Sequence, residues 1–231
     1  MLPDYISGEQ IWDQLVKMKD DEENDLNIRL HRGVYITHID RKNKIITTNT
    51  GEEVSYDKLI LGTGSRSTRP KDLPNIDGIF TMRTRDDADN FKKYVPENGH
   101  VVIVGGGLLG LELSASLREL NIGVTVIQRI SRLMDRQLDN LGSDLLHQEV
   151  VDRGVNVLFN DEVQLLLGKE KITGVKLKSG KTIACNAIVY AIGTTPNIEI
   201  AKECGLSCNR GVVVNEHLQT SDESIFAMPK K

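Results

Sequence analysis

The chain has 231 residues, a formal net charge of −4, and 39% hydrophobic and 27% charged residues, which is an ordinary globular composition. The acidic balance is unlike the basic footprint of a nucleic-acid-binding domain. No apolar run reaches the about 18 residues of a membrane-spanning helix, and the opening MLPDYISGEQ lacks the regions of a signal peptide. We expect no nucleic-acid or membrane partner and a cytoplasmic location.

The N-terminal part is predicted to contain short elements. Residues 8–19 favour a helix, and the acidic run 20–23 favours a solvated loop. Apolar and β-branched runs predict strands at 33–39, 44–49 and 58–61. A helix is expected at 85–94, ending before Pro96.

From residue 99 onward the pattern alternates between strands and helices. The predicted strands are 100–104, 123–128, 155–159 and 187–192, and the predicted helices are 108–120 and 137–152. A β-rich segment is expected at 162–184. This alternation predicts an α/β fold with a doubly wound, Rossmann-like parallel sheet and right-handed crossovers.

A glycine-rich turn joins the first strand and helix of this pattern. The stretch VVIVGGGLLG places Gly105, Gly107 and Gly110 in a G-x-G-x-x-G fingerprint between a predicted strand and a predicted helix. In such a fingerprint the first glycine makes the tight turn and the second lets the backbone approach a pyrophosphate. The third glycine allows close helix–strand packing. The turn predicts dinucleotide binding at the helix N-terminus.

An internal repeat accompanies this turn. Residues 46–64, ITTNTGEEVSYDKLILGTG, align without gaps on residues 175–193, VKLKSGKTIACNAIVYAIG, at an offset of 129. The repeat predicts two related dinucleotide-binding units. Moving back by the same offset from Gly105 leads to a position before residue 1, so the chain is expected to begin after its own first phosphate-binding turn.

Six segments together resemble the pyridine nucleotide-disulfide oxidoreductase superfamily. They are YDKLILGTGS (56–65), GGGLLGLE (105–112), AIGTTPN (191–197), GVVVNEHLQTSDESIFA (211–227), LPDYISGE (2–9) and RLMDRQLD (132–139). The last two resemble the FAD/NAD(P)H module of assimilatory nitrite reductase large subunits most. A first FAD fingerprint and the family's motif after "IFA" are absent, so the chain resembles a fragment.

The resemblance implies three regions. These are a partial FAD-binding domain at 1–96, an NAD(P)H-binding domain at 97–217 and a truncated return to the FAD domain at 218–231. It also implies hydride transfer from NAD(P)H to FAD and onward electron transfer to a sirohaem, iron–sulfur or ferredoxin-like acceptor. FAD is expected in the full-length protein and is in doubt for this fragment. Self-association is expected from the apolar surface that missing segments would leave.

The resemblance also implies the site residues. The NAD(P)H pyrophosphate would lie against Gly105, Gly106, Gly107, Leu108, Leu109 and Gly110. Gly193, with Thr194 and Pro196, would lie at the nicotinamide half. FAD would contact Thr63, Gly64 and Ser65, with Arg83 and Asp87 as further candidates or as a surface helix cap. Glu112 would orient the nicotinamide, although an acidic residue near a helix N-terminus also complements the dipole.

The choice between NAD and NADP stays open at the end of the second strand. An acidic side chain there would bind the ribose 2′-OH, but the residue is the neutral Gln128. Gln128 can still hydrogen-bond a 2′-OH, and Arg129 and Arg132 could meet a 2′-phosphate or be surface charges.

Three cysteines argue against a disulfide framework. Cys204 and Cys208 form one C-x3-C without a second pair, which favours reduced thiols over a metal site. No dithiol pair of a disulfide reductase is expected either. Two alternatives to the nitrite reductase interpretation remain: a ferredoxin or rubredoxin reductase, and a nucleotide-binding module without catalysis.

Overall fold

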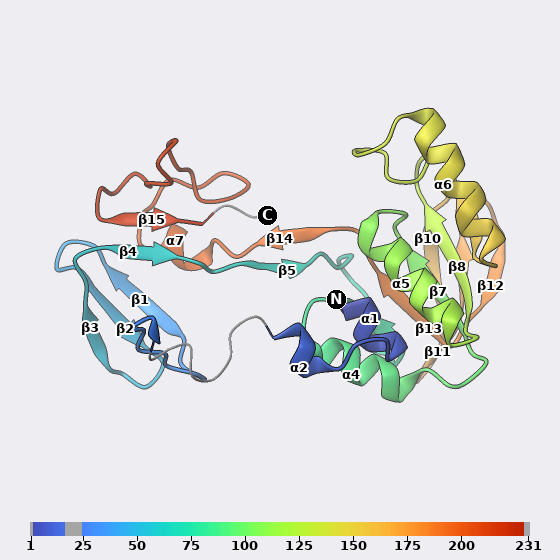
Figure 1. Ribbon diagram of the computed structural model, residues 1–231, viewed down its shortest axis with the longest axis horizontal. Coiled ribbons are helices and arrows are strands. Elements are labelled where there is room, and N and C mark those ends of the chain that lie inside the picture. The colour runs from blue at the N-terminus through green and yellow to red at the C-terminus, as the bar shows by residue number, and fades with distance from the viewer. Residues whose placement is uncertain (1, 17–24, 229–231) are drawn as a thin grey trace. The chain divides into compact units, whose positions relative to one another are not determined.

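The structure is a computed structural model that describes residues 2–16 and 25–228 (Figure 1). The chain divides into two compact units. The first comprises Met1–Lys17 and Ser67–Gly193, and the second comprises Met18–Arg66 and Thr194–Lys231.

A five-stranded sheet with the order β6-β13-β7-β8-β9 forms the centre of the first unit. Its strands are β6 (Ile79–Phe80), β7 (His100–Val104), β8 (Gly123–Gln128), β9 (Asn156–Phe159) and β13 (Ala187–Tyr190). All neighbouring pairs are parallel, which confirms the predicted α/β class. The strand order reverses between β7 and β13, and the carboxyl ends of strands at such a switch point form the ligand crevice of open α/β sheets.

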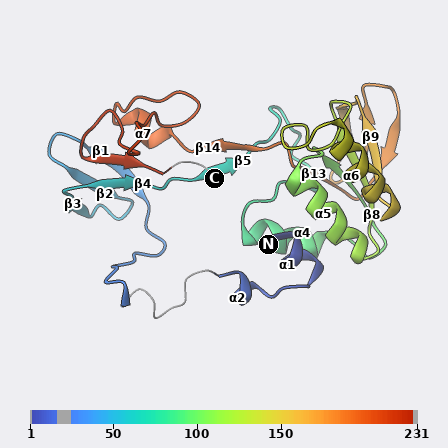
Figure 2. The same ribbon diagram turned by 45° about the horizontal axis from the view of Figure 1, so that its top comes forward.

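The two faces of this sheet are covered differently. Val101 and Ile103 of β7 are fully buried together with Leu113 and Leu117 of α5 (Leu108–Glu119). Helices α4 (Arg85–Tyr94) and α6 (Asn140–Asp152) add to the same core, and the helical layer is visible beside the sheet in Figures 1 and 2. Val102 faces the opposite side, where an antiparallel sheet of β10 (Val163–Gly168), β11 (Ile172–Leu177) and β12 (Thr182–Ala184) replaces a second helical layer. This sheet is the β-rich segment expected at 162–184.

The N-terminal helix differs from its prediction. One helix was expected over 8–19, but α1 (Leu2–Ser7) ends before this range and only the four-residue α2 (Trp12–Leu15) lies within it. That prediction was wrong because Gly8 is left-handed at a φ of 84°, and because Ile11 and Val16 have extended backbone that limits the helix to α2. Residues 17–19 and the predicted loop at 20–23 lie outside the described residues. Tyr5 of α1 donates from its hydroxyl to Asp89 Oδ1 of α4 at 2.6 Å, which ties α1 to the helical layer.

The second unit is built from small sheets. β1 (Ile36–Asp40), β2 (Ile45–Thr48) and β3 (Glu53–Ser55) form an antiparallel sheet, and β4 (Leu59–Leu61) pairs in parallel with β15 (Ile225–Ala227). β5 (Ser65–Ser67) pairs with β14 (Thr194–Pro196), which is followed by α7 (Glu199–Glu203). The core of the unit consists of Ile39, Leu61, Ala201, Leu206, Ile225 and Ala227.

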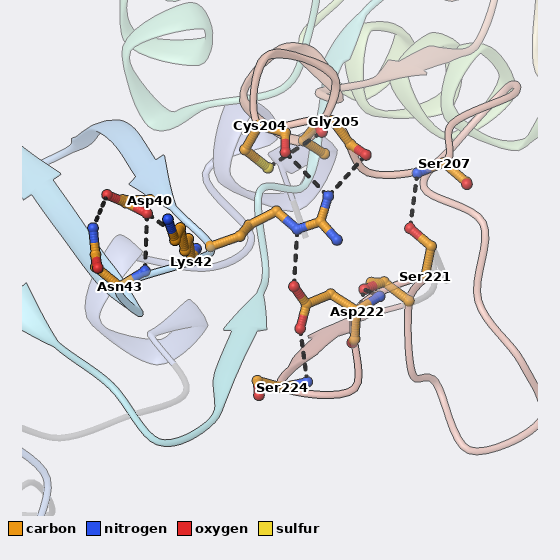
Figure 3. Close-up of polar contacts among 12 residues, drawn as sticks. Asp40, Lys42, Asn43, Cys204, Gly205, Ser207, Ser221, Asp222 and Ser224 are labelled. Atoms are coloured by element: carbon orange, nitrogen blue, oxygen red, sulfur yellow. Dashed lines mark hydrogen bonds and ion pairs between the residues drawn. The ribbon is translucent and has the colours of Figure 1, made fainter.

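Arg41 connects three segments of this unit, and its partners Cys204, Gly205 and Asp222 are labelled in Figure 3. Its Nε donates to Asp222 Oδ2 at 2.8 Å, and its Nη1 donates to the carbonyl oxygens of Cys204 and Gly205 at 3.3 and 3.0 Å. The loop after β1 is thereby held to the end of α7 and to the turn before β15.

The two copies of the internal repeat pair their strands in the same register. Ile45 and Ser55 are partners between β2 and β3, and Gly174 and Ala184 are the corresponding partners, 129 residues later, between β11 and β12. The equivalence extends to the next strand. Leu59 N–H of β4 donates to Ser224 O, and Ile188 N–H of β13 donates to Gly78 O, each at the start of a parallel partner strand. The two repeats therefore share turn, register and edge pairing.

The compact units have bounds other than the expected divisions after 96 and 217. Residues 67–96 belong to the first unit because β6 pairs with β13 and because Ala88 and Phe91 enter its core. Residues 194–217 belong to the second unit because Ala201 and Leu206 enter that core. The flavin and nicotinamide roles of these regions stay predictions.

Candidate functional site

The glycine turn lies at the carboxyl end of β7, at the switch point. Gly105 has a φ of 116°, and a Cβ there would be 2.5 Å from Ala191 O at the end of β13. A Cβ at Gly110 would be 2.1 Å from Gly105 O. Gly107 differs, because nothing lies within 4 Å of a Cβ built on it. The three glycines therefore provide a tight turn, an open backbone position and close helix–strand packing.

The N-terminus of α5 has no side-chain cap. Gly107 is its N-cap residue and makes no side-chain hydrogen bond, whereas Thr84 and Asp139 cap α4 and α6 through their side chains. The first N–H groups of a helix have no intrahelical acceptor, and they carry the positive end of the helix dipole. Open space at Gly107 and an uncapped helix N-terminus together suit a pyrophosphate.

The side-chain amide of Gln128 hydrogen-bonds to Gly106 of the glycine turn and to Arg132 of the loop after β8, and this pair of contacts is the Gln128 brace. Gln128 is 9% exposed, its Oε1 accepts from Gly106 N–H at 3.1 Å, and its Nε2 donates to Arg132 O at 3.0 Å. Gly106 O accepts from Met134 N–H at 3.0 Å. Both backbone groups of Gly106 are thus held by β8 and the loop after it. Sequence reasoning missed Met134, because a backbone contact of this kind leaves no signal in the residue type.

The two arginines near Gln128 have different surroundings. Arg132 donates to Asn140 Oδ1 at the start of α6 at 2.8 Å and to Asp135 O of its own loop at 3.0 Å, which directs its side chain onto these two segments. The Arg129 side chain is 79% exposed, and its Nε lies 3.9 Å from Glu162 Oε1, at the limit of an ion pair. Arg129 is thus the freer cation at this edge. Glu112 is exposed on the outer surface of α5.

The remaining candidates on the nicotinamide side lie in different compact units. Gly193 follows β13 at a φ of 100° and accepts from Thr68 N–H at 2.9 Å, whereas Thr194 and Pro196 lie in β14 of the second unit. Asp87 Oδ2 accepts from Arg83 N–H and from Thr84 N–H, both at 2.8 Å. Asp87 thus caps α4, which confirms its interpretation as a helix cap, whereas a flavin contact of Arg83 and Asp87 stays a prediction.

The flavin-side candidates lie after β4, and Asn197 holds two of them. Thr63 Oγ1 donates to Asn197 O at 2.7 Å, Asn197 Nδ2 donates to Thr63 O at 2.9 Å, and Asn197 N–H donates to Gly64 O at 3.0 Å. Ser65 is buried, at 8% exposure. Asn197 was not singled out from the sequence, although it ends the AIGTTPN motif.

The cysteines are free thiols, and burial raises the pKa of the Cys185 thiol to about 11. Within the described part of the chain, no group of three His, Cys, Asp or Glu side chains could hold a metal ion. In the same residues, no helix is long and apolar enough to cross a membrane.

The parallel sheet and its glycine turn define a Rossmann-type dinucleotide-binding protein. The family model described as "Pyridine nucleotide-disulphide oxidoreductase" matches residues 6–228. The chain belongs to this family.

Known relatives extend this comparison. The chain is 31% identical over 230 residues to an assimilatory nitrate reductase electron transfer subunit of Bacillus subtilis, covering 99% of this chain and 30% of the relative. It is 33% identical over 209 residues to a nitrite reductase [NAD(P)H] of the same organism, covering 90% and 26%. The crystal structure of a ferredoxin reductase from Rhodopseudomonas palustris superposes with a TM-score of 0.91 at 28% identity, covering 98% and 56%. The chain thus spans less than a third of the length of each of the two Bacillus subtilis relatives. It spans about half of the length of the ferredoxin reductase.

Proposed function

We propose that this chain is the NAD(P)H-binding and flavin-side part of a flavoprotein oxidoreductase that passes hydride from NAD(P)H to FAD and electrons onward. The observation that carries the proposal is the open Gly107 position at the uncapped N-terminus of α5, set at the sheet's switch point. FAD, when bound, supplies the hydride acceptor and can release electrons one at a time.

The chain's own residues would bind and orient. Backbone N–H groups of residues 107–110 would receive the pyrophosphate, and Glu112 is proposed to orient the nicotinamide. In the second unit, Thr63 and Gly64 are exposed after β4 and fixed by Asn197, as a backbone contact for FAD requires.

The onward acceptor distinguishes two versions of the proposal. Similarity to nitrate and nitrite reductase subunits supports a nitrite reductase large subunit with sirohaem and iron–sulfur centres. Similarity to a ferredoxin reductase supports a separate ferredoxin- or rubredoxin-like acceptor. NADH-dependent reduction of nitrite, compared with that of a ferredoxin, separates the two when it is measured on the full-length protein. A module without catalysis would support neither reaction.

Calorimetric titration with NADH and NADPH tests nucleotide binding itself. The wild-type chain should bind at least one of them. Gly107→Ala places a methyl group where the pyrophosphate approaches and should weaken binding by about 10- to 100-fold, since overpacking typically costs about 1–3 kcal/mol. The thermal midpoint should not change, because the space is open and Gly107 has a φ of −89°.

The matched control is Gly211→Ala in the second unit, where nothing lies within 4 Å of the added Cβ. It should bind like the wild type. A wild-type chain that binds neither coenzyme contradicts the proposed function, and so does unchanged binding by Gly107→Ala.

A further inference from the structure

We propose that Gln128 is a positioning residue that aims the glycine turn at the pyrophosphate, and that it does not distinguish NADH from NADPH. This inference rests on the proposed function for the identity of the ligand. It replaces the expectation that the residue at the end of the second strand contacts the ribose 2′ position.

The first argument is the orientation of the amide. Oε1 faces the N–H of Gly106 and Nε2 faces the carbonyl of Arg132, at 3.1 and 3.0 Å. Rotating the amide by 180° would place a donor against a donor and an acceptor against an acceptor, so these partners fix its orientation. Gln128 is 9% exposed, and these two hydrogen bonds direct its polar atoms into the protein.

The second argument is the packing around Gly106. Gly106 O accepts from Met134 N–H at 3.0 Å, and a Cβ on Gly106 would be 2.5 Å from Leu133 Cδ2. Leu133 is fully buried, and its carbonyl accepts from Ser143 Oγ of α6 at 3.0 Å. The loop after β8 is therefore anchored on α6 and presses against the middle of the glycine turn.

Gln128 should affect the binding of the pyrophosphate and not that of the ribose. The Gly106 peptide precedes Gly107 and sets the direction of the N–H groups at the start of α5. The pyrophosphate at that place is the same in NADH and NADPH. Loss of the two Gln128 hydrogen bonds should therefore lower the affinities for NADH and NADPH by the same factor. Loss of a group that contacts the ribose would instead change the ratio of the two affinities.

Gln128→Met tests the brace, because it keeps the length of the side chain and removes both hydrogen bonds. We expect both affinities to fall by about tenfold, as two buried hydrogen bonds imply, with their ratio unchanged. The Gly106 amide should exchange its hydrogen at least about tenfold faster, a readout that needs no coenzyme. Gln148→Met makes the same chemical change on the exposed side of α6 and should alter neither quantity.

Gln128→Glu gives a pH signature that general damage to the fold would not give. A carboxylate can accept from Gly106 N–H but repels the Arg132 carbonyl, whereas a protonated carboxyl restores the donor. Because burial raises the pKa of a carboxyl, affinity for NAD⁺ relative to wild type should recover as the pH falls from about 8 to about 5.5.

Several outcomes would overturn the proposal. They are a tenfold change in the coenzyme ratio in Gln128→Met, an unchanged exchange rate at Gly106, or a flat relative pH profile in Gln128→Glu. A wild-type chain that binds neither coenzyme would instead contradict the proposed function, and the exchange rate at Gly106 would still decide whether the brace exists.

Discussion

Gly110 packs directly against Gly105, because a Cβ added to Gly110 would lie 2.1 Å from the Gly105 carbonyl oxygen. This contact closes the glycine turn, because it brings the first turn of α5 onto the end of β7. The obstacle is backbone, which cannot rotate away as the end of a flexible side chain can. A side chain at position 110 therefore forces the helix and the strand apart.

Gly110→Ala should accordingly destabilise the chain by about 1–3 kcal/mol, the usual cost of overpacking a tight contact. Urea unfolding measures the loss. Gly107→Ala adds the same methyl group three residues earlier into open space and should stay within about 0.5 kcal/mol of the wild type. Equal stability of the two variants would show that α5 can shift without cost.

Local patterns in the sequence were sufficient for the glycine turn and for helix α4. The fingerprint reveals its turn because Gly110 packs against Gly105 five residues earlier, and Thr84 and Asp87 start α4 through a reciprocal cap within four residues. The repeat at an offset of 129 likewise corresponds to strands that share their register in the structure. Each of these features involves contacts within a short stretch of chain, and residue types reveal such contacts.

Contacts between distant segments were not accessible in this way. Gln128 meets Gly106 and Arg132 only because the loop after β8 folds under the turn. Asn197 meets Thr63 across 134 residues of sequence. At Gly8, one glycine could either interrupt a helix or end one, and local pattern did not show that α1 stops there. Side-chain partners and unit boundaries depend on tertiary packing, which single-sequence patterns leave open.

The Arg41–Asp222 pair should contribute measurably to stability. Its side chains are 31% and 18% exposed, and Arg41 also serves two carbonyl oxygens. Arg41→Met should cost about 1–3 kcal/mol in thermal or urea unfolding, as expected for partly buried charged hydrogen bonds. Arg153→Met is the comparison, because its pair with Glu149 is more than half exposed and should cost at most about 0.5 kcal/mol.

This contribution has a defined pH dependence. The Arg41 guanidinium holds the pKa of Asp222 below its ordinary value. The stabilisation is therefore complete above the pKa of an unfolded aspartate, about 3.9, and is lost as the pH falls through the lower folded-state pKa. The stability difference between wild type and Arg41→Met should narrow below about pH 4. A constant difference down to the acid limit would contradict this assignment.

His100 should make the first unit sensitive to mild acid. Burial, and secondarily Arg118, lower the pKa of His100 in the folded chain. The folded state therefore binds fewer protons than the unfolded state below about pH 6.5, and stability should fall as the pH drops from about 7 towards 5. His100→Gln should flatten this slope in urea unfolding, and His217→Gln, whose side chain is 79% exposed, should leave it unchanged.

The last strands of the two repeats differ in how far they are covered, and this difference predicts different binding of NAD(P)H and FAD. Ile60 of β4 is 64% exposed, whereas Val189, its counterpart in β13, is fully buried. β13 has β6 and β7 on its two sides, but β4 pairs with β15 alone among the described strands. A flavin unit equivalent to the first unit would need a second neighbouring strand at the edge of β4 opposite β15, and a covering layer over Ile60.

We therefore expect the purified 231-residue chain to bind NAD(P)H while retaining far less than one FAD per chain. Visible absorbance measures the flavin, and calorimetry with NADH on the same preparation verifies that the first unit is folded. Stoichiometric flavin in that preparation would show that β4 and Thr63–Gly64 suffice for FAD without a second neighbouring strand.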